Sequence, residues 1–156
     1  MEKRMEYLRR SILVVLSIAM ALGAALFIPR IGGIEKAVAA DQPSNLVSIA
    51  KGELGKKERS AGSDDIEYND WYYGRRVINS RQAEYAWCAV FVSWCADRAG
   101  IPTSIIPAEK NTTRMKNKII SNGGTQHLKG SGYMPQKGDI IFFGANASQH
   151  VGIVDY

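Results

Sequence analysis

The sequence predicts an α+β domain, in which helices come first along the chain and strands follow. Apolar residues recur at helical spacing in several segments between residues 44 and 121, whereas residues 139–143 and 149–155 have the apolar, β-branched pattern of two short strands. Helices grouped ahead of strands, without alternation, are typical of an α+β fold. The length of 156 residues suffices for one domain with a real core.

The N-terminal segment has the pattern of an export signal or a membrane anchor. Four basic residues precede an uncharged apolar run over residues 11–28, namely Lys3, Arg4, Arg9 and Arg10. Small residues before Asp41 suit cleavage after Ala40, but a retained anchor stays open. Because basic residues predominate before the run, the rest of the chain is expected outside the membrane. Residues 1–40 are therefore predicted to be a signal peptide or anchor, and residues 41–156 a secreted or extracytoplasmic domain.

The net charge of the exported part bears on its partners. The formal charge of the whole chain is +5, but residues 41–156 carry 14 Lys and Arg against 12 Asp and Glu. This surplus of two gives no case for nucleic-acid binding, although it suits contact with an anionic polymer.

The first helix is predicted over residues 44–53. Its apolar residues have helical spacing, with Ser44 as N-cap and Gly55 as the stop. Residues 56–80 are polar and predict a long loop around the aromatic group Trp71, Tyr72 and Tyr73. A later polar stretch, residues 107–121, predicts an exposed helix that ends before Gly123.

A buried helix is predicted over residues 85–99. Ser93 is the single polar residue among residues 86–96, and a helix that is apolar on all sides is a buried one. It contains both cysteines, Cys88 near its start and Cys95 two turns later. Seven residues at the helical rise separate them by about 10 Å, which is too far for a disulfide.

Cys88 is the candidate nucleophile. Cysteine attacks as the thiolate, and the unpaired N–H groups at a helix N-terminus stabilise an anion. A core role is the commoner explanation of a buried cysteine, and it describes Cys95 well.

Two histidines are candidates for the base. His127 lies in a loop rich in Gly and Lys, where a solvated side chain is expected. His150 opens the second strand, from which it can project toward a helix packed across the sheet. Taken alone, His150 is equally well explained as a surface residue at a strand end.

Metal sites are not expected. Cys88, Cys95, His127 and His150 are metal-ligand types, but no CxxC or HxxxH spacing supports a site. A group of acidic residues at positions 64, 65, 67 and 70 does not fit the calcium-loop spacing of an EF-hand and predicts a solvated acidic loop.

Three segments, taken together, closely resemble the CHAP family, the cysteine, histidine-dependent amidohydrolases/peptidases of bacterial and phage cell-wall lysis. They are residues 85–96 (YAWCAVFVSWCA), 135–143 (PQKGDIIFF) and 149–154 (QHVGIV), and residues 49–55 (IAKGELG) extend the resemblance to about three-quarters of the chain. It implies a papain-like α+β fold, related to the NlpC/P60 superfamily, with a nucleophile helix packed on an antiparallel sheet.

The resemblance also implies a chemistry and a partner. Cys88 matches the nucleophile, His150 matches the base, and Cys95 matches a second cysteine of no catalytic role. The substrate would be bacterial peptidoglycan, cut as by an N-acetylmuramoyl-L-alanine amidase or a peptide endopeptidase, with no metal or organic cofactor. The backbone N–H of Cys88 is the natural oxyanion donor.

One departure from the family pattern concerns the residue that orients the histidine. In the family, a polar residue on a later strand does this, whereas here only Asp155 follows His150 before the chain ends at Tyr156. The C-terminal strands are therefore expected to be missing, and the chain to be a truncated, nearly inactive form. Two alternatives stay open: a non-catalytic cell-wall-binding or scaffolding module of the same fold, and a transpeptidase or transglutaminase-like crosslinker.

Overall fold

The computed structural model describes residues 32–78 and 85–156. The chain divides into two compact units, Met1–Lys36 and Ala37–Tyr156, and the second contains the later part of α2 and every element after it. The predicted export segment, residues 11–28, lies outside the described residues. Within the described ranges, no helix is both long and apolar enough to cross a membrane.

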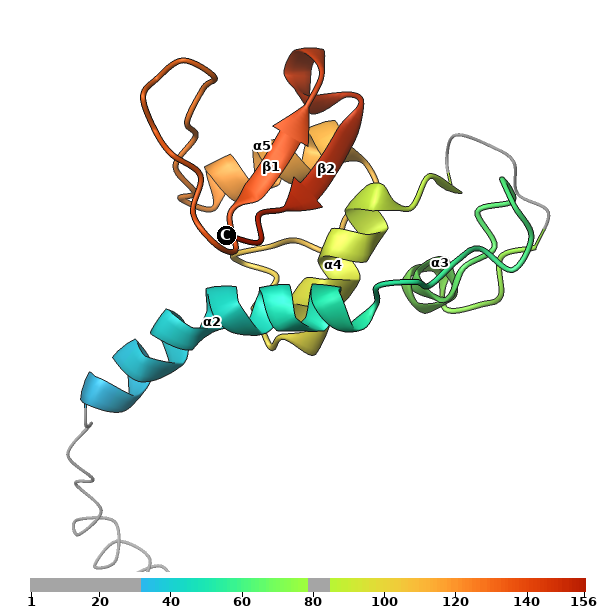
Figure 1. Ribbon diagram of the computed structural model, residues 1–156, viewed down its shortest axis with the longest axis horizontal. Coiled ribbons are helices and arrows are strands. Elements are labelled where there is room, and N and C mark those ends of the chain that lie inside the picture. The colour runs from blue at the N-terminus through green and yellow to red at the C-terminus, as the bar shows by residue number, and fades with distance from the viewer. Residues whose placement is uncertain (1–31, 79–84) are drawn as a thin grey trace, which may run out of the picture. The chain divides into compact units, whose positions relative to one another are not determined.

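The described elements confirm the α+β class, because helices precede a small sheet (Figure 1). In chain order they are α2 (Gly32–Gly52), α3 (Glu67–Tyr73), α4 (Cys88–Arg98), α5 (Thr112–Ser121), β1 (Ile140–Phe143), a short 3₁₀ helix (Ala145–Ala147) and β2 (His150–Ile153). The two strands pair antiparallel, and Phe143 lies opposite His150. Both strands match the predicted ones.

Helix α4 is the centre of the core, as its composition predicts. One side of it packs in a cluster with Leu46 of α2, Met115 of α5 and Val151 of β2. On another side, Val90 packs with Ile66 and Tyr68 around α3. Because neighbours cover α4 on both sides, its residues up to Ala96 are apolar apart from Ser93, and the charged Asp97 and Arg98 lie at its exposed end.

Ser93, the one polar residue of α4 before Asp97, has a structural role. Its Oγ accepts a hydrogen bond from the backbone N–H of Glu109 at 3.0 Å. The Ser93 hydroxyl can also donate its hydrogen to the carbonyl of Ala89, at 2.9 Å, or to the carbonyl of Glu109, at 3.1 Å. The hydroxyl therefore fastens the segment before α5 to the buried helix.

Replacing Ser93 by alanine should lower the free energy of unfolding by about 1–3 kcal/mol, because the buried N–H of Glu109 loses its acceptor. Urea unfolding measures the loss. Ser48 is an exposed serine in α2, so Ser48→Ala is the matched control and should change stability by less than about 0.5 kcal/mol. Equal effects of the two substitutions would contradict this role.

The predicted start of the first helix is wrong. Helix α2 begins at Gly32, so Ser44 lies inside it and does not cap it, and Pro43 is within the helix. Proline removes one backbone donor, and α2 continues through that position. Tertiary contacts hold the later part of α2 in place: Leu46 and Val47 are buried, and the Asn45 amide donates to the carbonyl of Ala99 at 3.1 Å.

The predicted loop over residues 56–80 contains the helix α3. This seven-residue helix has acidic residues in its first turn and ends at Gly74, whose φ of 63° is in the left-handed region. A helix this short depends on packing, which the buried residues Tyr68 and Asn69 provide.

The predicted start of the polar helix is also wrong, because it is five residues too early. Helix α5 begins at Thr112, where the Asn111 side chain caps it by accepting from the N–H of Arg114 at 2.9 Å. Residues 107–111 instead pass over Ser93. The capping asparagine is the sequence signal for this boundary.

Candidate active site at the start of helix α4

Cys88 is the first residue of α4 and is partly buried, with a free thiol. The first turn is closed by the N–H of Phe91, which donates to the carbonyl of Trp87 at 2.7 Å. The N–H groups of Cys88, Ala89 and Val90 precede this bond, so they are the helix donors without an intrahelical acceptor. Such donors stabilise a thiolate and, during acyl transfer, an oxyanion.

Trp87, the residue before Cys88, is held by a hydrogen bond to Glu58 and by neighbouring aromatic rings. Its indole N–H donates to Glu58 Oε1 at 2.9 Å, and Glu58 Oε2 accepts from the N–H of Ser63 at 3.0 Å. The hydrogen bond from Trp87 lowers the pKa of Glu58. The indole also packs on the rings of Tyr68 and Phe91, with centroids 5.7 and 6.2 Å away. The start of the helix is thereby fixed in place.

Asn69 of α3 fixes the chain slightly further upstream. It is fully buried, and its amide nitrogen donates to the carbonyls of Asp64 and Tyr85, each at 2.8 Å. Among the described residues, its Oδ1 has no hydrogen-bond partner. Through Tyr85, α3 is tied to the segment that leads into Cys88.

Cys95 is a core residue, as predicted. Its side chain is fully buried, and burial, with a smaller contribution from Glu53, raises the pKa of this thiol to about 12. Cys95 is therefore protonated at neutral pH. Both cysteines are free thiols.

His150 is the first residue of β2 and is exposed, with its ring 6.0 Å from that of Phe143 and tilted by 31°. The next residue, Val151, belongs to the cluster against which Cys88 packs. The strand that begins with the histidine therefore packs on the helix that begins with the cysteine. Within the described residues, no hydrogen bond joins the Cys88 thiol to the His150 ring.

The turn before His150 is fixed by α5. The hydroxyl of Thr112 donates to the carbonyl of Ala147, and that of Thr113 donates to the carbonyl of Asn146 at 3.0 Å. Asn146 and Ala147 have φ values of 53° and 61°, in the left-handed region that side chains disfavour. A strained turn next to a candidate catalytic residue is a recurring feature of functional sites.

His127 lies in the exposed loop after α5, as predicted. Its ring stacks on Tyr133 at a centroid distance of 3.7 Å. The hydroxyl of Tyr133 donates to Asp139 Oδ2 at 2.8 Å, which raises the pKa of Tyr133. His127 is thus part of the contacts within its own loop.

The predicted solvated acidic loop is wrong in one respect. Asp65 is buried and pairs with Arg59 and Arg76, while Asp70 pairs with Arg59 at 2.7 Å. The hydrogen bond from Arg59 lowers the pKa of Asp65. Arginine side chains from both sides of α3 neutralise these carboxylates. No group of three or more His, Cys, Asp or Glu in the described ranges is arranged to hold a metal ion.

Asp155, the acidic residue that follows His150, is engaged elsewhere. Its carboxylate pairs with Lys51 of α2 at 2.8 Å. It therefore points toward the end of α2.

The fold and the site together define a domain with a thiol at the start of a buried helix and a histidine on the sheet packed against that helix. The family model of the CHAP domain matches residues 80–156, which confirms the resemblance to the CHAP family over this segment. CHAP domains are typically cysteine- and histidine-dependent amidases or peptidases, so this match indicates a peptidoglycan hydrolase or amidase-like role in general terms. No curated protein and no solved structure matches the chain significantly.

Proposed function

We propose that this chain is an exported peptidoglycan hydrolase that cleaves amide bonds by acyl transfer, with Cys88 as nucleophile and His150 as base. The observation that supports it best is the position of Cys88 as the first residue of a buried helix that packs on the strand headed by His150. A papain-like arrangement of helix and sheet is part of this proposal.

The chemistry follows from the groups at the helix start. The Cys88 thiolate adds to the amide carbonyl carbon, and the N–H of Cys88 donates to the oxyanion that forms. The C–N bond then breaks, and the amine leaves with a proton from the His150 imidazolium. Water, deprotonated by His150, attacks the thioester, which releases the carboxylic acid and restores the thiolate. The net reaction is amide plus water to carboxylic acid plus amine.

One observation favours a second function, that of a non-catalytic cell-wall-binding module. Asp155, the acidic residue closest after His150 in the sequence, is paired with Lys51 instead of the imidazole. Without an orienting partner, the histidine of such a pair loses much of its efficiency. Labelling by a thiol-reactive amide analogue separates the two functions, since an enzyme labels Cys88 much faster than Cys95.

Replacing His150 by alanine should lower the rate of amide hydrolysis in purified peptidoglycan by about 10²–10⁴-fold, because the leaving amine loses its proton donor. The assay measures new amino groups and tests for crosslinked products, whose absence excludes a transpeptidase. His127→Ala is the matched control and should keep the rate within about twofold, because its ring contacts Tyr133 of its own loop. A rate lost in His127→Ala and kept in His150→Ala would show that the base is misassigned.

A further inference from the structure

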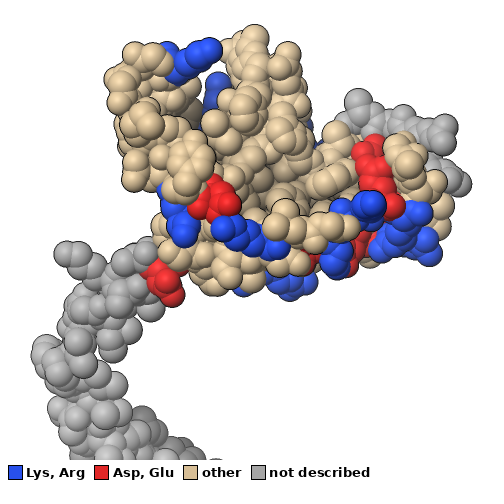
Figure 2. Space-filling view, in the orientation of Figure 1, with Lys and Arg blue, Asp and Glu red and all other residues tan. Residues whose placement is uncertain are grey.

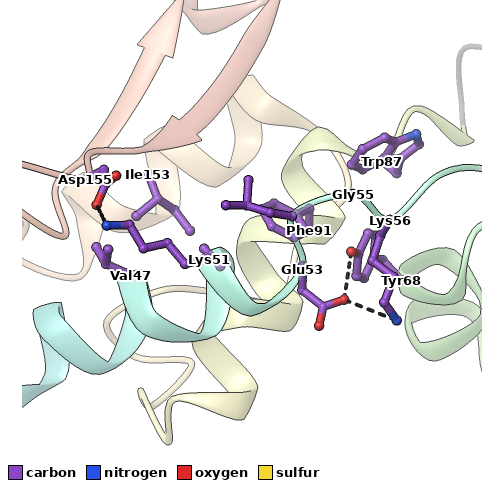
Figure 3. A pocket seen from close by; sticks show the side chains of 12 residues that line it. Val47, Lys51, Glu53, Gly55, Lys56, Tyr68, Trp87, Phe91, Ile153 and Asp155 are labelled. Atoms are coloured by element: carbon purple, nitrogen blue, oxygen red, sulfur yellow. Dashed lines mark hydrogen bonds and ion pairs between the residues drawn. The ribbon is translucent and has the colours of Figure 1, made fainter.

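A groove lies beside the candidate nucleophile, between the end of α2, α3, the first turn of α4 and the end of β2 (Figure 3). It encloses about 420 Å³, which is within the usual size of a ligand site. Among the residues that line it are Lys51, Glu53, Lys56, Trp87, Phe91 and Asp155.

The groove adjoins the reaction centre through its aromatic wall. Trp87 directly precedes Cys88, and Phe91 lies one helical turn further along α4. Cys88 and His150 are not among the residues that line the groove, so the connection to the candidate site is made through Trp87, the residue before Cys88. Leu54, which also lines the groove, is 81% exposed and leaves apolar surface available to a ligand.

Charges of both signs lie at two places along the groove. Lys51 and Asp155 form one ion pair at 2.8 Å, and both side chains are more than half exposed. Glu53 and Lys56 form the other, longer pair at 3.7 Å. Figure 2 shows that the visible charged side chains gather at the level of α2 and around α3, while the surface over the strands is largely uncharged.

Of the two lining carboxylates, Glu53 is the less exposed, since its side chain is 16% exposed and that of Asp155 is 57% exposed. Its Oε2 accepts from the Tyr68 hydroxyl at 3.0 Å and makes the long contact to Lys56. Lys56 is closer to Glu67, at 2.7 Å, and this hydrogen bond raises the pKa of Lys56. Figure 3 shows no interaction at the other oxygen of Glu53 with the side chains drawn there. The side chain of Glu53 is 16% exposed, so a cation bound there is partly removed from water.

We infer that this groove is a subsite for the peptide part of the substrate, and that Glu53 pairs with a primary ammonium group of that peptide. The inference rests on the proposed function, because the groove ends at the residue before the proposed nucleophile. A peptide that carries an amine and carboxylates matches a groove with an apolar wall and charges of both signs. The Lys51–Asp155 pair lies at the other end, toward β2.

The test compares two probes on the full chain carrying Cys88→Ala, so that no turnover occurs. The probes are the synthetic peptide N-acetyl-Ala-D-Glu-Lys and the same peptide acetylated on its lysine amine. Isothermal titration calorimetry should give about tenfold weaker binding of the acetylated probe, the usual effect of losing a hydrogen bond between charged groups. Adding Glu53→Gln should bring the ratio of the two dissociation constants close to one. Glutamine keeps an acceptor for Tyr68 but no charge.

Asp155→Asn is the matched control, because it removes a carboxylate at the far end of the same groove, and the tenfold ratio should persist there. The inference is overturned if neither probe binds, if both bind equally before Glu53 is changed, or if the ratio survives Glu53→Gln. Hydrolysis of peptidoglycan by the chain with Cys88 intact is measured separately. Hydrolysis without discrimination between the probes overturns the subsite alone. Discrimination without hydrolysis supports the subsite and overturns the enzymatic function.

Discussion

Replacing Cys88 by alanine should abolish the release of amino groups from peptidoglycan while the domain stays folded. The thiol is the only group at the start of α4 that can form the acyl intermediate, and water at the same position is a far weaker nucleophile. The loss should reach at least about 10³-fold in rate, with thermal unfolding nearly unchanged because Cys88 is only partly buried.

Cys95→Ala is the matched variant on the same helix. It removes a fully buried thiol, so the free energy of unfolding should fall by about 1–2 kcal/mol, while most of the activity remains. Urea unfolding and the amine-release assay measure the two effects. An inactive but well-folded Cys95→Ala chain, together with an active Cys88→Ala chain, would reverse the assignment of the nucleophile.

Replacing Glu109 is expected to have the second large effect, this time on the free energy of unfolding. Its side chain is 4% exposed and pairs with Arg114 and Lys118, each at 2.9 Å. It also accepts from the N–H groups of Lys110 and Asn111. Glu109→Gln should lower the free energy of unfolding by about 2 kcal/mol at neutral pH, because hydrogen bonds to a charged group are lost in a buried setting. Urea unfolding at pH 7 measures it.

The same residue predicts how stability depends on pH. Burial opposes ionisation of Glu109, but the hydrogen bonds from Arg114, Lys118 and the two backbone groups outweigh it and lower the pKa to about 2. In the unfolded chain, a glutamate titrates near its ordinary value of about 4.3. The folded state therefore binds the proton less readily, and the stabilisation is present above about pH 5 and lost as pH falls toward 2.

Unfolding measured between pH 7 and pH 2 should accordingly show a smaller loss of stability in Glu109→Gln than in the unchanged chain. Glu67→Gln is the matched control, since Glu67 also pairs with a lysine, Lys56, but its side chain is 43% exposed. Its effect at pH 7 should stay within about 1 kcal/mol. If Glu67→Gln is as destabilising as Glu109→Gln, burial is not what gives Glu109 its importance.

The sequence predicts the buried helix and the two strands because their signals are local. An apolar run broken by one serine describes α4 up to Ala96, and the segments around Ile140 and His150 are too short and too β-branched for helices. The start of α2 and the presence of α3 depend on tertiary packing instead. Pro43 predicts a helix boundary, but α2 continues through this residue. Helix α3 is stabilised by burial of Tyr68 and Asn69.

Some residues of the candidate site can likewise be predicted from the sequence, and others cannot. Cys88 and His150 have recognisable local patterns, so they are found from sequence. Glu58 and Asn69 do not: their partners Trp87 and Tyr85 lie 29 and 16 residues away along the chain. A polar residue in a polar stretch has no signal of such a contact. Their part in positioning the helix start appears only once the chain is folded.

The state of Cys95 decides how the protein tolerates oxidants. Oxidation of Cys88 to a sulfenic acid is ordinarily reversed when a second thiolate condenses with it to form a disulfide. The other cysteine of the chain is protonated, fully buried and about 10 Å further along α4, so it cannot resolve that adduct. Recovery of the oxidised protein therefore depends on a reductant supplied from outside the chain.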